Sequence, residues 1–165
     1  MSRAFVKEDG PEPSEDPPER PVSPHPNYVT RRGLGLLQDL EERLFAEHAA
    51  LPPGKTDPAV RKRKLEIERD VRYVRARLET AIPVDPADPR PQEVRFGAGV
   101  KLRREDGREL ALRIVGEDEA LEGGESVSWT APFVAALFGL APGAELVWES
   151  ESVTERWTVV SVSYP

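Results

Sequence analysis

The chain has 165 residues, a net charge of −7 and no cysteine. This length suits one or two small domains, and the lack of cysteine excludes disulfides, thiolate metal sites and cysteine nucleophiles. The negative charge argues against non-specific nucleic-acid binding by the whole surface, because a phosphate backbone is held by a basic footprint. No apolar stretch approaches the roughly 20 residues that span a bilayer, so we expect a cytoplasmic protein without a membrane partner.

Residues 1–27 are rich in proline and acidic side chains. They contain seven prolines and six acidic residues, a composition that buries too little apolar surface to offset the entropy of ordering. We therefore expect residues 1–27 to form a flexible tail.

Residues 28–82 are predicted to form two helices that fold back on each other as an antiparallel coiled-coil hairpin. Thr30 suits the N-cap of a helix that runs to about Ala50. In the second helix, seam residues recur at alternating steps of four and three, with Lys64 as the one polar member. These residues are Val60, Lys64, Ile67, Val71, Val74, Leu78 and Ala81. We expect Lys64 to reach solvent at the end of the seam rather than to make a specific contact.

The turn between the helices has the sequence LPPGKTDP. Gly54, Lys55 and Thr56 match the end of a nucleotide-binding loop, but position 49 is alanine where such a loop needs glycine. Asp57 precedes a proline, which biases it away from the helical conformation. The turn is therefore predicted to be the hairpin tip rather than a phosphate-binding loop.

Residues 83–92 contain four prolines and no periodicity, which indicates a linker of limited flexibility. From residue 93 to residue 165 the pattern changes to period two, which is typical of strands. Asp106-Gly107 joins two such strands as a hairpin.

A short helix is expected from about Pro132 to Phe138, before two final strands. The last strand has two apolar phases, which indicates a bulge or a strand covered on both faces. The fold class is α+β: a helical hairpin followed by a small antiparallel sheet domain with one short helix.

No acid, base or nucleophile constellation is present. Ser126, Ser128 and Ser161 lie in strand patterns without a nearby base. His25 and His48 are expected to be solvated rather than to bind zinc. The acidic run Glu117 to Glu119 is more typical of a solvated loop than of a metal site. No catalytic residue, cofactor or metal is assigned.

Charge is distributed unevenly. Residues 59–81 carry eight Lys or Arg against four Asp or Glu, whereas residues 92–165 carry seven against thirteen. The basic run at the start of the second helix has two interpretations, a solvated helix end or a surface for an acidic partner. It consists of Arg61, Lys62, Arg63 and Lys64.

Several segments resemble the bacterial GreA/GreB transcript-cleavage factors: VRFGAGVKL, DGRELALRIVGEDEA, SVSWTAP and ALFGLAPGAELV. MSRAF, NYVTRRGL and RYVRARLE are most similar to the GreB branch, and the resemblance covers nearly the whole chain from Asn27 onward. It implies an FKBP-like sheet domain that binds RNA polymerase at the rim of the secondary channel. It also implies that the GEDEA segment contacts the polymerase: Gly116, Glu117, Asp118, Glu119 and Ala120.

The chain departs from that family at the tip. In members that stimulate cleavage, acidic tip residues help to hold the second magnesium ion, whereas here Asp57 is the one carboxylate of the tip. The hairpin is also shorter by about fourteen residues, which removes roughly 10 Å of reach.

We therefore expect a monomeric, non-catalytic protein that occupies the polymerase channel and makes no sequence-specific contact with nucleic acid. Two alternatives stay open: cleavage that uses Asp57, and binding of another acidic protein through Arg61 to Lys64. The hairpin seam could also pair between chains.

Overall fold

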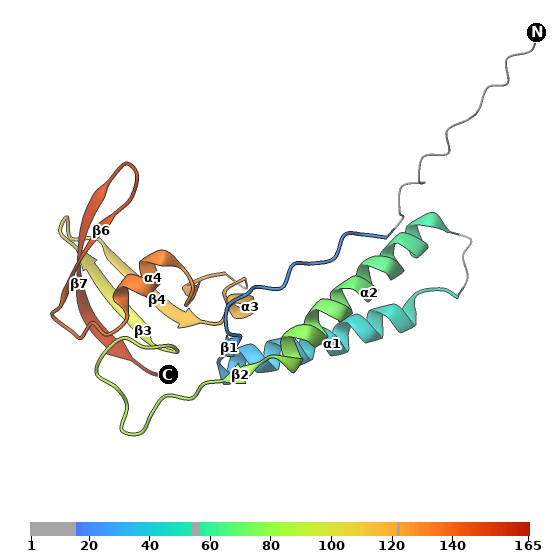
Figure 1. Ribbon diagram of the computed structural model, residues 1–165, viewed down its shortest axis with the longest axis horizontal. Helices are drawn as coiled ribbons and strands as arrows, with labels where there is room; N and C mark the ends of the chain where they lie inside the picture. The colour runs from blue at the N-terminus through green and yellow to red at the C-terminus, as the bar shows by residue number, and fades with distance from the viewer. Residues whose placement is uncertain (1–15, 54–56, 122) are drawn as a thin grey trace, which may run out of the picture.

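The structure, a computed structural model, describes residues 16–53, 57–121 and 123–165. A helical hairpin formed by α1 and α2 projects from a curled sheet domain, and the two parts meet at the base of the hairpin (Figure 1). The base is the end opposite the turn at residues 51–57. Within the described ranges, no helix combines the length and apolar character that a membrane span requires.

The hairpin consists of α1 (Arg31–Ala50) and α2 (Pro58–Glu79). The Thr30 side chain caps α1 by accepting a hydrogen bond from the Gly33 backbone N–H at 2.9 Å. The Asp57 side chain likewise caps α2 by accepting a hydrogen bond from the Ala59 N–H. Pro58 lies in the first turn of α2, where a backbone N–H has no partner within the helix, so the missing N–H of proline costs no hydrogen bond. Both predicted helices, and the predicted Thr30 cap, are confirmed.

The apolar seam between the two helices is confirmed in its central part. Leu44 from α1 packs with Ile67 and Val74 from α2, and Ile67 and Val74 are completely buried. The expectation for Lys64 is wrong, because its Nζ donates a hydrogen bond to the Pro52 carbonyl oxygen at 2.8 Å. This contact ties α2 to the segment that follows α1.

Two short strands not predicted from the sequence close the base of the hairpin. β1 (Tyr28–Val29) and β2 (Ile82–Pro83) pair in parallel. The Ile82 N–H donates to the Asn27 carbonyl oxygen at 2.8 Å. The chain entering α1 is therefore bonded to the chain leaving α2, and β2 includes the first residue of the expected linker.

The sheet domain contains five strands in the order β5-β4-β3-β7-β6. Asp106-Gly107 forms the predicted turn between β3 and β4, and Gly107 has a positive φ of 86°, which glycine adopts without strain. The strands are β3 (Gly99–Arg104), β4 (Glu109–Val115), β5 (Ser126–Ser128), β6 (Glu145–Glu149) and β7 (Thr154–Ser163).

The α+β class is confirmed, with two corrections to the predicted sheet domain. β5 pairs with β4 in parallel, so the sheet is mixed rather than antiparallel. A second helix, α3 (Glu117–Ala120), occupies part of the expected polar loop. The connection through α3 brings the chain back to run in the direction of β4, which explains the parallel pair.

One face of the sheet packs against α4 (Pro132–Leu137), the predicted short helix. Leu102, Ile114, Val134 and Leu137 are completely buried there. The predicted bulge in β7 is confirmed, because Ser161 pairs with Lys101 while Val159 pairs with Leu102. Val160 is left between the two pairs and is exposed.

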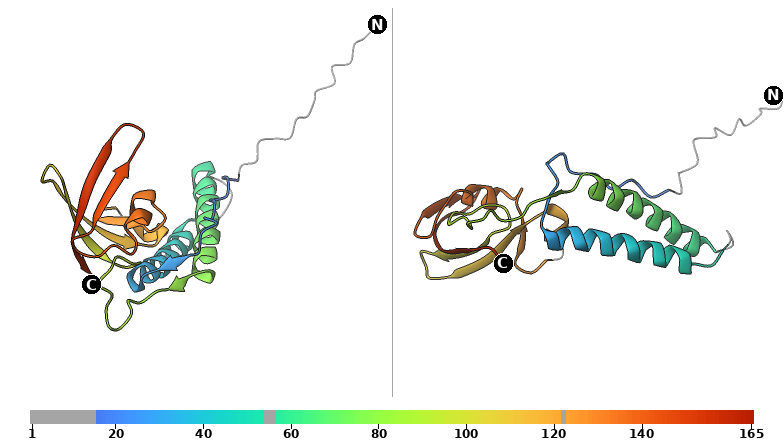
Figure 2. Two further views of the ribbon diagram at one scale, coloured as in Figure 1. Left: turned by 60° about the vertical axis from the view of Figure 1, so that its left-hand side comes forward. Right: turned by 90° about the horizontal axis from the view of Figure 1, so that it is seen from below.

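Residues 16–27, which we name the N-terminal strap, run beside α2 toward the base of the hairpin (Figures 1 and 2). The Arg20 guanidinium lies 3.8 Å from the centre of the Tyr73 ring. Asn27 is buried, and its Nδ2 donates to the Arg77 carbonyl oxygen at 2.7 Å. This part of the predicted flexible tail therefore makes specific contacts, and residues 1–15 lie outside the described ranges.

Candidate functional site

The hairpin tip offers a single carboxylate. The predicted tip residues Gly54, Lys55 and Thr56 lie outside the described ranges. Asp57 is exposed, and its Oδ1 accepts a hydrogen bond from the Ala59 backbone N–H at 2.8 Å. Its carboxylate is therefore engaged as the helix cap of α2.

Carboxylates farther along the hairpin are paired with cations of the same chain. Arg63 donates from Nε to Glu47 at 2.7 Å and from NH1 to Glu66 at 3.3 Å. The hydrogen bond from Arg63 lowers the pKa of Glu47, and the two acids together raise the pKa of Arg63. The negative charges of Glu47 and Glu66 are thus compensated by Arg63 within the same chain.

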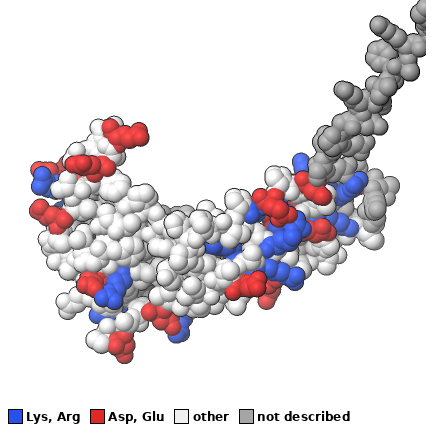
Figure 3. Space-filling view, viewed as in Figure 1, with Lys and Arg blue, Asp and Glu red and all other residues white. Residues whose placement is uncertain are grey.

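The predicted basic run does not form one continuous patch. Arg63 is bonded to Glu47, and Lys64 is bonded to the Pro52 carbonyl oxygen. Arg61 and Lys62 are exposed. On the face seen in Figure 3, the Lys and Arg side chains of the hairpin are interleaved with Asp and Glu.

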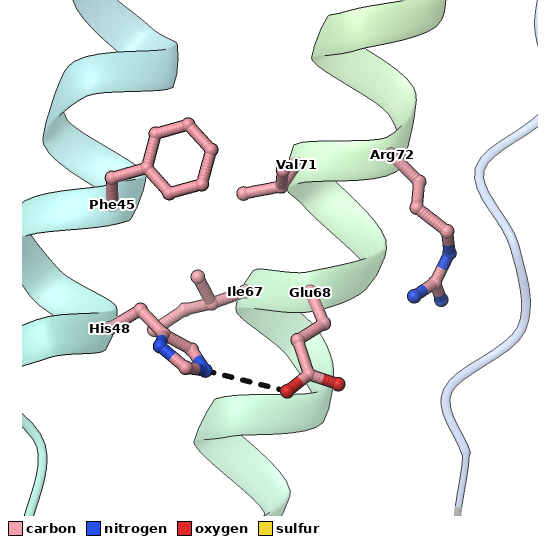
Figure 4. Close-up of a pocket in the computed structure, with 6 residues that line it drawn as sticks. All are labelled: Phe45, His48, Ile67, Glu68, Val71 and Arg72. Carbon is pink, nitrogen blue, oxygen red and sulfur yellow. Dashed lines mark hydrogen bonds and ion pairs between the residues drawn. The ribbon is translucent and has the colours of Figure 1, made fainter.

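An apolar groove of about 340 Å³ lies between the two helices. Phe45 from α1 faces Val71 from α2 across it, and Phe45 is 43 % exposed (Figure 4). At one end of the groove, His48 Nε2 lies 3.3 Å from Glu68 Oε1. His48 is only partly buried, in keeping with the solvated side chain predicted from the sequence.

The base of the hairpin carries a cluster of charged contacts. Gly116, which precedes α3, approaches β1 so closely that an added Cβ would lie 2.5 Å from the Tyr28 carbonyl oxygen. Glycine therefore permits the sheet domain to pack directly on the hairpin base. This contact brings all three acidic residues of α3 against the hairpin.

We name this set of contacts the acidic joint. Asp118 accepts hydrogen bonds from the Tyr73 hydroxyl and from Arg77 Nε, each at 2.6 Å. Glu117 accepts from the strap residue Ser23 at 2.8 Å and lies 3.4 Å from the NH2 group of Arg77. The joint consists of Thr30, Arg32, Tyr73, Arg77, Glu117, Asp118 and Glu119.

Glu119 is the most buried acid of the joint, with 2 % of its surface exposed. The Thr30 hydroxyl donates to one of its oxygens, and Arg32 NH1 donates to the other at 3.0 Å. Thr30 therefore caps α1 and holds Glu119 with the same hydroxyl group.

Arg77 and Tyr73 are residues of the acidic joint that the sequence did not predict. Arg77 has only 1 % of its surface exposed although it lies one residue before the seam position Leu78. Burial, followed by the hydrogen bond to Asp118, raises the pKa of Tyr73 to about 12. The RYVRARLE segment contains both residues, but apolar spacing predicts only apolar residues in a core and therefore does not predict a buried arginine.

The joint therefore links the two parts of the molecule through ion pairs. Gly116 and Glu119 are buried, while the Glu117 and Asp118 side chains keep 24 % and 12 % of their surface exposed. Contact of Gly116 to Ala120 with RNA polymerase stays a prediction. Within the described residues, no group of three or more His, Cys, Asp or Glu side chains is arranged to hold a metal ion.

Comparison with known proteins connects this architecture to a family. The family described as "Transcription elongation factor, GreA/GreB, C-term" matches residues 89–164. Transcription elongation factor GreB of Neisseria meningitidis serogroup B is 37% identical over 105 residues, which are 63% of this chain and 64% of that protein. GreB of Haemophilus influenzae is 32% identical over 140 residues, which are 76% of this chain and 89% of that protein.

The chain belongs to the GreA/GreB family. The resemblance predicted from the sequence is thus confirmed. The aligned part of this Gre-family chain spans less than two thirds of the Neisseria relative, at 64% of its length. A solved structure of GreA/GreB from Nitrosomonas europaea has 25% sequence identity and a TM-score of 0.42, and the match covers 85% of this chain and 99% of that chain.

Proposed function

We propose that this Gre-family chain binds RNA polymerase at the secondary channel and regulates transcription without stimulating transcript cleavage. One observation carries the proposal: Asp57 is the single carboxylate of the tip segment 51–58, and it is engaged as a helix cap. Cleavage factors of the family are expected to use several tip acids to hold the second magnesium ion.

The chemistry of a two-metal site explains why one capping aspartate is insufficient. The carboxylates must fix the cation within about an ångström of its working position to orient the attacking water. In Asp57, Oδ1 is already bonded to the Ala59 N–H. Glu47 and Glu66, the next acids along the hairpin, are held by Arg63.

The rod shape of the hairpin supports the proposal that it enters a channel. α1 has 20 residues, which corresponds to a rod of about 30 Å at 1.5 Å per residue. The Phe45 groove and the exposed Arg61 and Lys62 give this rod apolar and basic surfaces for contact with a channel wall. Such a rod would compete with other channel-binding factors.

The first test combines polymerase binding with RNA cleavage in one sample. Purified polymerase core in a stalled, backtracked complex is incubated with the chain and magnesium, and the RNA length is followed. We expect the chain to elute with the polymerase and the RNA to shorten at the rate of polymerase alone. Failure to bind polymerase would overturn the proposal and favour another acidic partner at Arg61 and Lys62.

Two variants of Asp57 separate metal binding from helix capping. Asp57→Asn keeps an effective N-cap and removes the charge, whereas Asp57→Ala removes both and costs about 1 kcal/mol of stability. We expect neither variant to change RNA shortening by more than about twofold. Stimulated cleavage by the unaltered chain that is lost in both variants would instead establish Asp57 as a metal ligand.

A further inference from the structure

The groove between α1 and α2 leaves an aromatic side chain uncovered. Phe45 is 43% exposed although it faces Val71 across the groove and the Arg75 guanidinium lies over its ring, 4.9 Å from the centre (Figure 4). Ile67 also lines the groove but is completely buried, so it offers no surface to a ligand. The accessible apolar surface is the Phe45 ring with the partly buried Val71, which suits a small group of apolar side chains.

The polar residues of the groove indicate which charge a ligand should carry. His48 and Glu68 lie 3.3 Å apart at one end, and the Glu68 side chain keeps 50% of its surface exposed. Arg72 completes the lining, and its Nε donates to Glu19 of the strap at 3.0 Å. A basic group beside the apolar side chains of a ligand would therefore complement the exposed Glu68 carboxylate.

The N-terminal strap brings the start of the described chain to this groove. Arg72 belongs to the groove lining and also holds Glu19 of the strap. The next strap residue, Arg20, lies 3.6 Å from Asp70 of the same helix. In Figure 4 the strap is the pale blue trace that passes α2 on the side of Arg72. Residues 1–15 therefore join the described chain next to the groove.

Residues 1–15 contain one apolar cluster, Ala4-Phe5-Val6, which we name the N-terminal triplet. Apart from Met1, the other residues of this range are polar, charged, glycine or proline. Arg3 precedes the triplet and Lys7 follows it. The triplet thus combines an aromatic anchor with basic flanks, which are the features that the Phe45 groove and Glu68 would accept.

The length of chain between the triplet and the strap is sufficient to reach the groove. From position 6 to position 16 the chain has ten residues, which span up to about 33 Å when extended. This reach exceeds the roughly 12 Å width of a helix with its side chains, so the triplet can pass around α2. A short tether also gives the triplet an effective concentration in the millimolar range, so a weak apolar contact is enough to hold it.

We propose that the N-terminal triplet docks in the Phe45 groove of its own chain, with Phe5 packed against Phe45 and a basic flank beside Glu68. Paired aromatic rings gain more than the burial of their area alone. The docked triplet covers the apolar face of the hairpin and therefore competes with any partner that binds there. Docking itself does not depend on polymerase binding, and it is measured without polymerase.

Paramagnetic broadening of NMR signals measures the docking in the whole chain. Because the protein has no cysteine, Ser2→Cys provides a single attachment point for a nitroxide label. We expect strong broadening of the Val71 methyl signals and none of the Val147 methyl signals, since Val147 lies exposed on β6 of the sheet domain. Equal broadening at the two valines, or none at Val71, would overturn the proposal.

Two variants separate docking from simple tethering. Phe5→Ser keeps the tether and removes the ring, and it should lower the docking equilibrium constant at least about tenfold, measured from the broadening at Val71. Val22→Ser is the matched control, because it removes an exposed apolar side chain from the strap and should leave the broadening unchanged. Unchanged broadening in Phe5→Ser would mean that the tether alone brings the label to the groove, which contradicts docking.

Phe45→Gln tests the groove side of the contact. Glutamine is a good helix former and Phe45 is partly exposed, so α1 should persist, and circular dichroism checks this. If the two rings meet, the double variant Phe5→Ser with Phe45→Gln should lose no more docking than either single variant. Additive losses would show that Phe5 does not contact Phe45.

A mixed sample identifies whose groove is occupied. Nitroxide-labelled Ser2→Cys protein without isotopes is mixed with isotope-labelled protein that carries no nitroxide. We expect no broadening of the Val71 signals in this mixture, because each triplet occupies the groove of its own chain. Broadening there would place the triplet on a second copy and overturn the intramolecular assignment.

Discussion

Tyr73 and Arg77 are polar residues on α2 that share one acceptor, Asp118. The tyrosine donates from its hydroxyl and the arginine donates from Nε, so each oxygen of the carboxylate has a partner. Charge-assisted hydrogen bonds of this kind are stronger than neutral ones and fix the angle between the groups. These residues therefore define how α3 sits on the hairpin.

The shifted pKa of Tyr73 gives a prediction in the alkaline range. The ordinary tyrosine pKa is about 10, and burial with the Asp118 contact raises it to about 12 in the folded chain. The stability contributed by the neutral hydroxyl should be complete below pH about 10 and lost as the pH rises toward 12.

Urea unfolding of the unaltered chain and of Tyr73→Phe measures this contribution. The variant should be less stable at neutral pH, and the difference in unfolding free energy should shrink above pH about 10. Tyr28 and Tyr164 are present in both proteins, so they do not contribute to the difference between them. A difference that stays constant to the highest pH would show that the Tyr73 pKa is not raised.

At the scale of single elements, the stability of α1 and α2 comes mainly from the apolar seam that they share. Ile67 and Val74 are completely buried on α2, whereas Leu65, only two residues before Ile67, is partly buried. In proteins, most helical stability comes from tertiary packing of an amphipathic face, so packing against α1 supplies most of the stability of α2.

Ile67→Ala tests the seam. Loss of a fully buried isoleucine should lower the unfolding free energy by about 2 to 4 kcal/mol, because the whole side chain is out of contact with water. The control, Leu65→Ala, should cost about 1 kcal/mol, because the leucine is already in part exposed to water. Equal losses in urea unfolding would contradict the observed orientation of α2.

At the scale of the whole molecule, the joint and the strap connect parts of the chain that are distant in sequence. Ser23 and Glu117, which are 94 positions apart, are hydrogen-bonded. Tyr28 of β1 and His25 of the strap both pack against the Trp129 ring, at 5.2 Å and 5.9 Å between centroids. The strap, the hairpin base and the sheet domain therefore meet in one place. The two parts should therefore unfold together while the joint is intact.

Arg77→Met tests this coupling, with Arg75→Met as control. Removing Arg77 leaves Asp118 and Glu117 without their buried cation and should cost about 3 kcal/mol. Arg75 pairs with Glu41 on the surface, so its loss should cost about 1 kcal/mol or less.

Two probes follow the unfolding of these variants in urea: tryptophan fluorescence for the sheet domain and circular dichroism for the hairpin. We expect the two curves to coincide in Arg75→Met and to separate in Arg77→Met. Coincident curves and equal stabilities for the two variants would mean that the joint does not couple the domains.

The wrong expectation for Lys64 and the missed burial of Arg77 have the same physical origin. Spacing rules assign a charged residue on a seam to the solvent, because an unpaired buried charge is costly. In the folded chain Lys64 reaches a carbonyl oxygen of residue 52, and Arg77 reaches an acid 41 positions away. A pattern of neighbouring residues cannot predict hydrogen-bond partners that are this distant in the sequence.

The sequence by itself determined the helical hairpin, its Thr30 cap, the Asp106-Gly107 turn and the presence of a single acidic residue at the tip. Each of these depends on residues within a few positions of one another, through period, capping and turn chemistry. Only the tertiary structure decided that the acids of α3 contact the hairpin and that Arg77 is buried against them. These features depend on which distant charges meet, and that is settled by packing the two parts together.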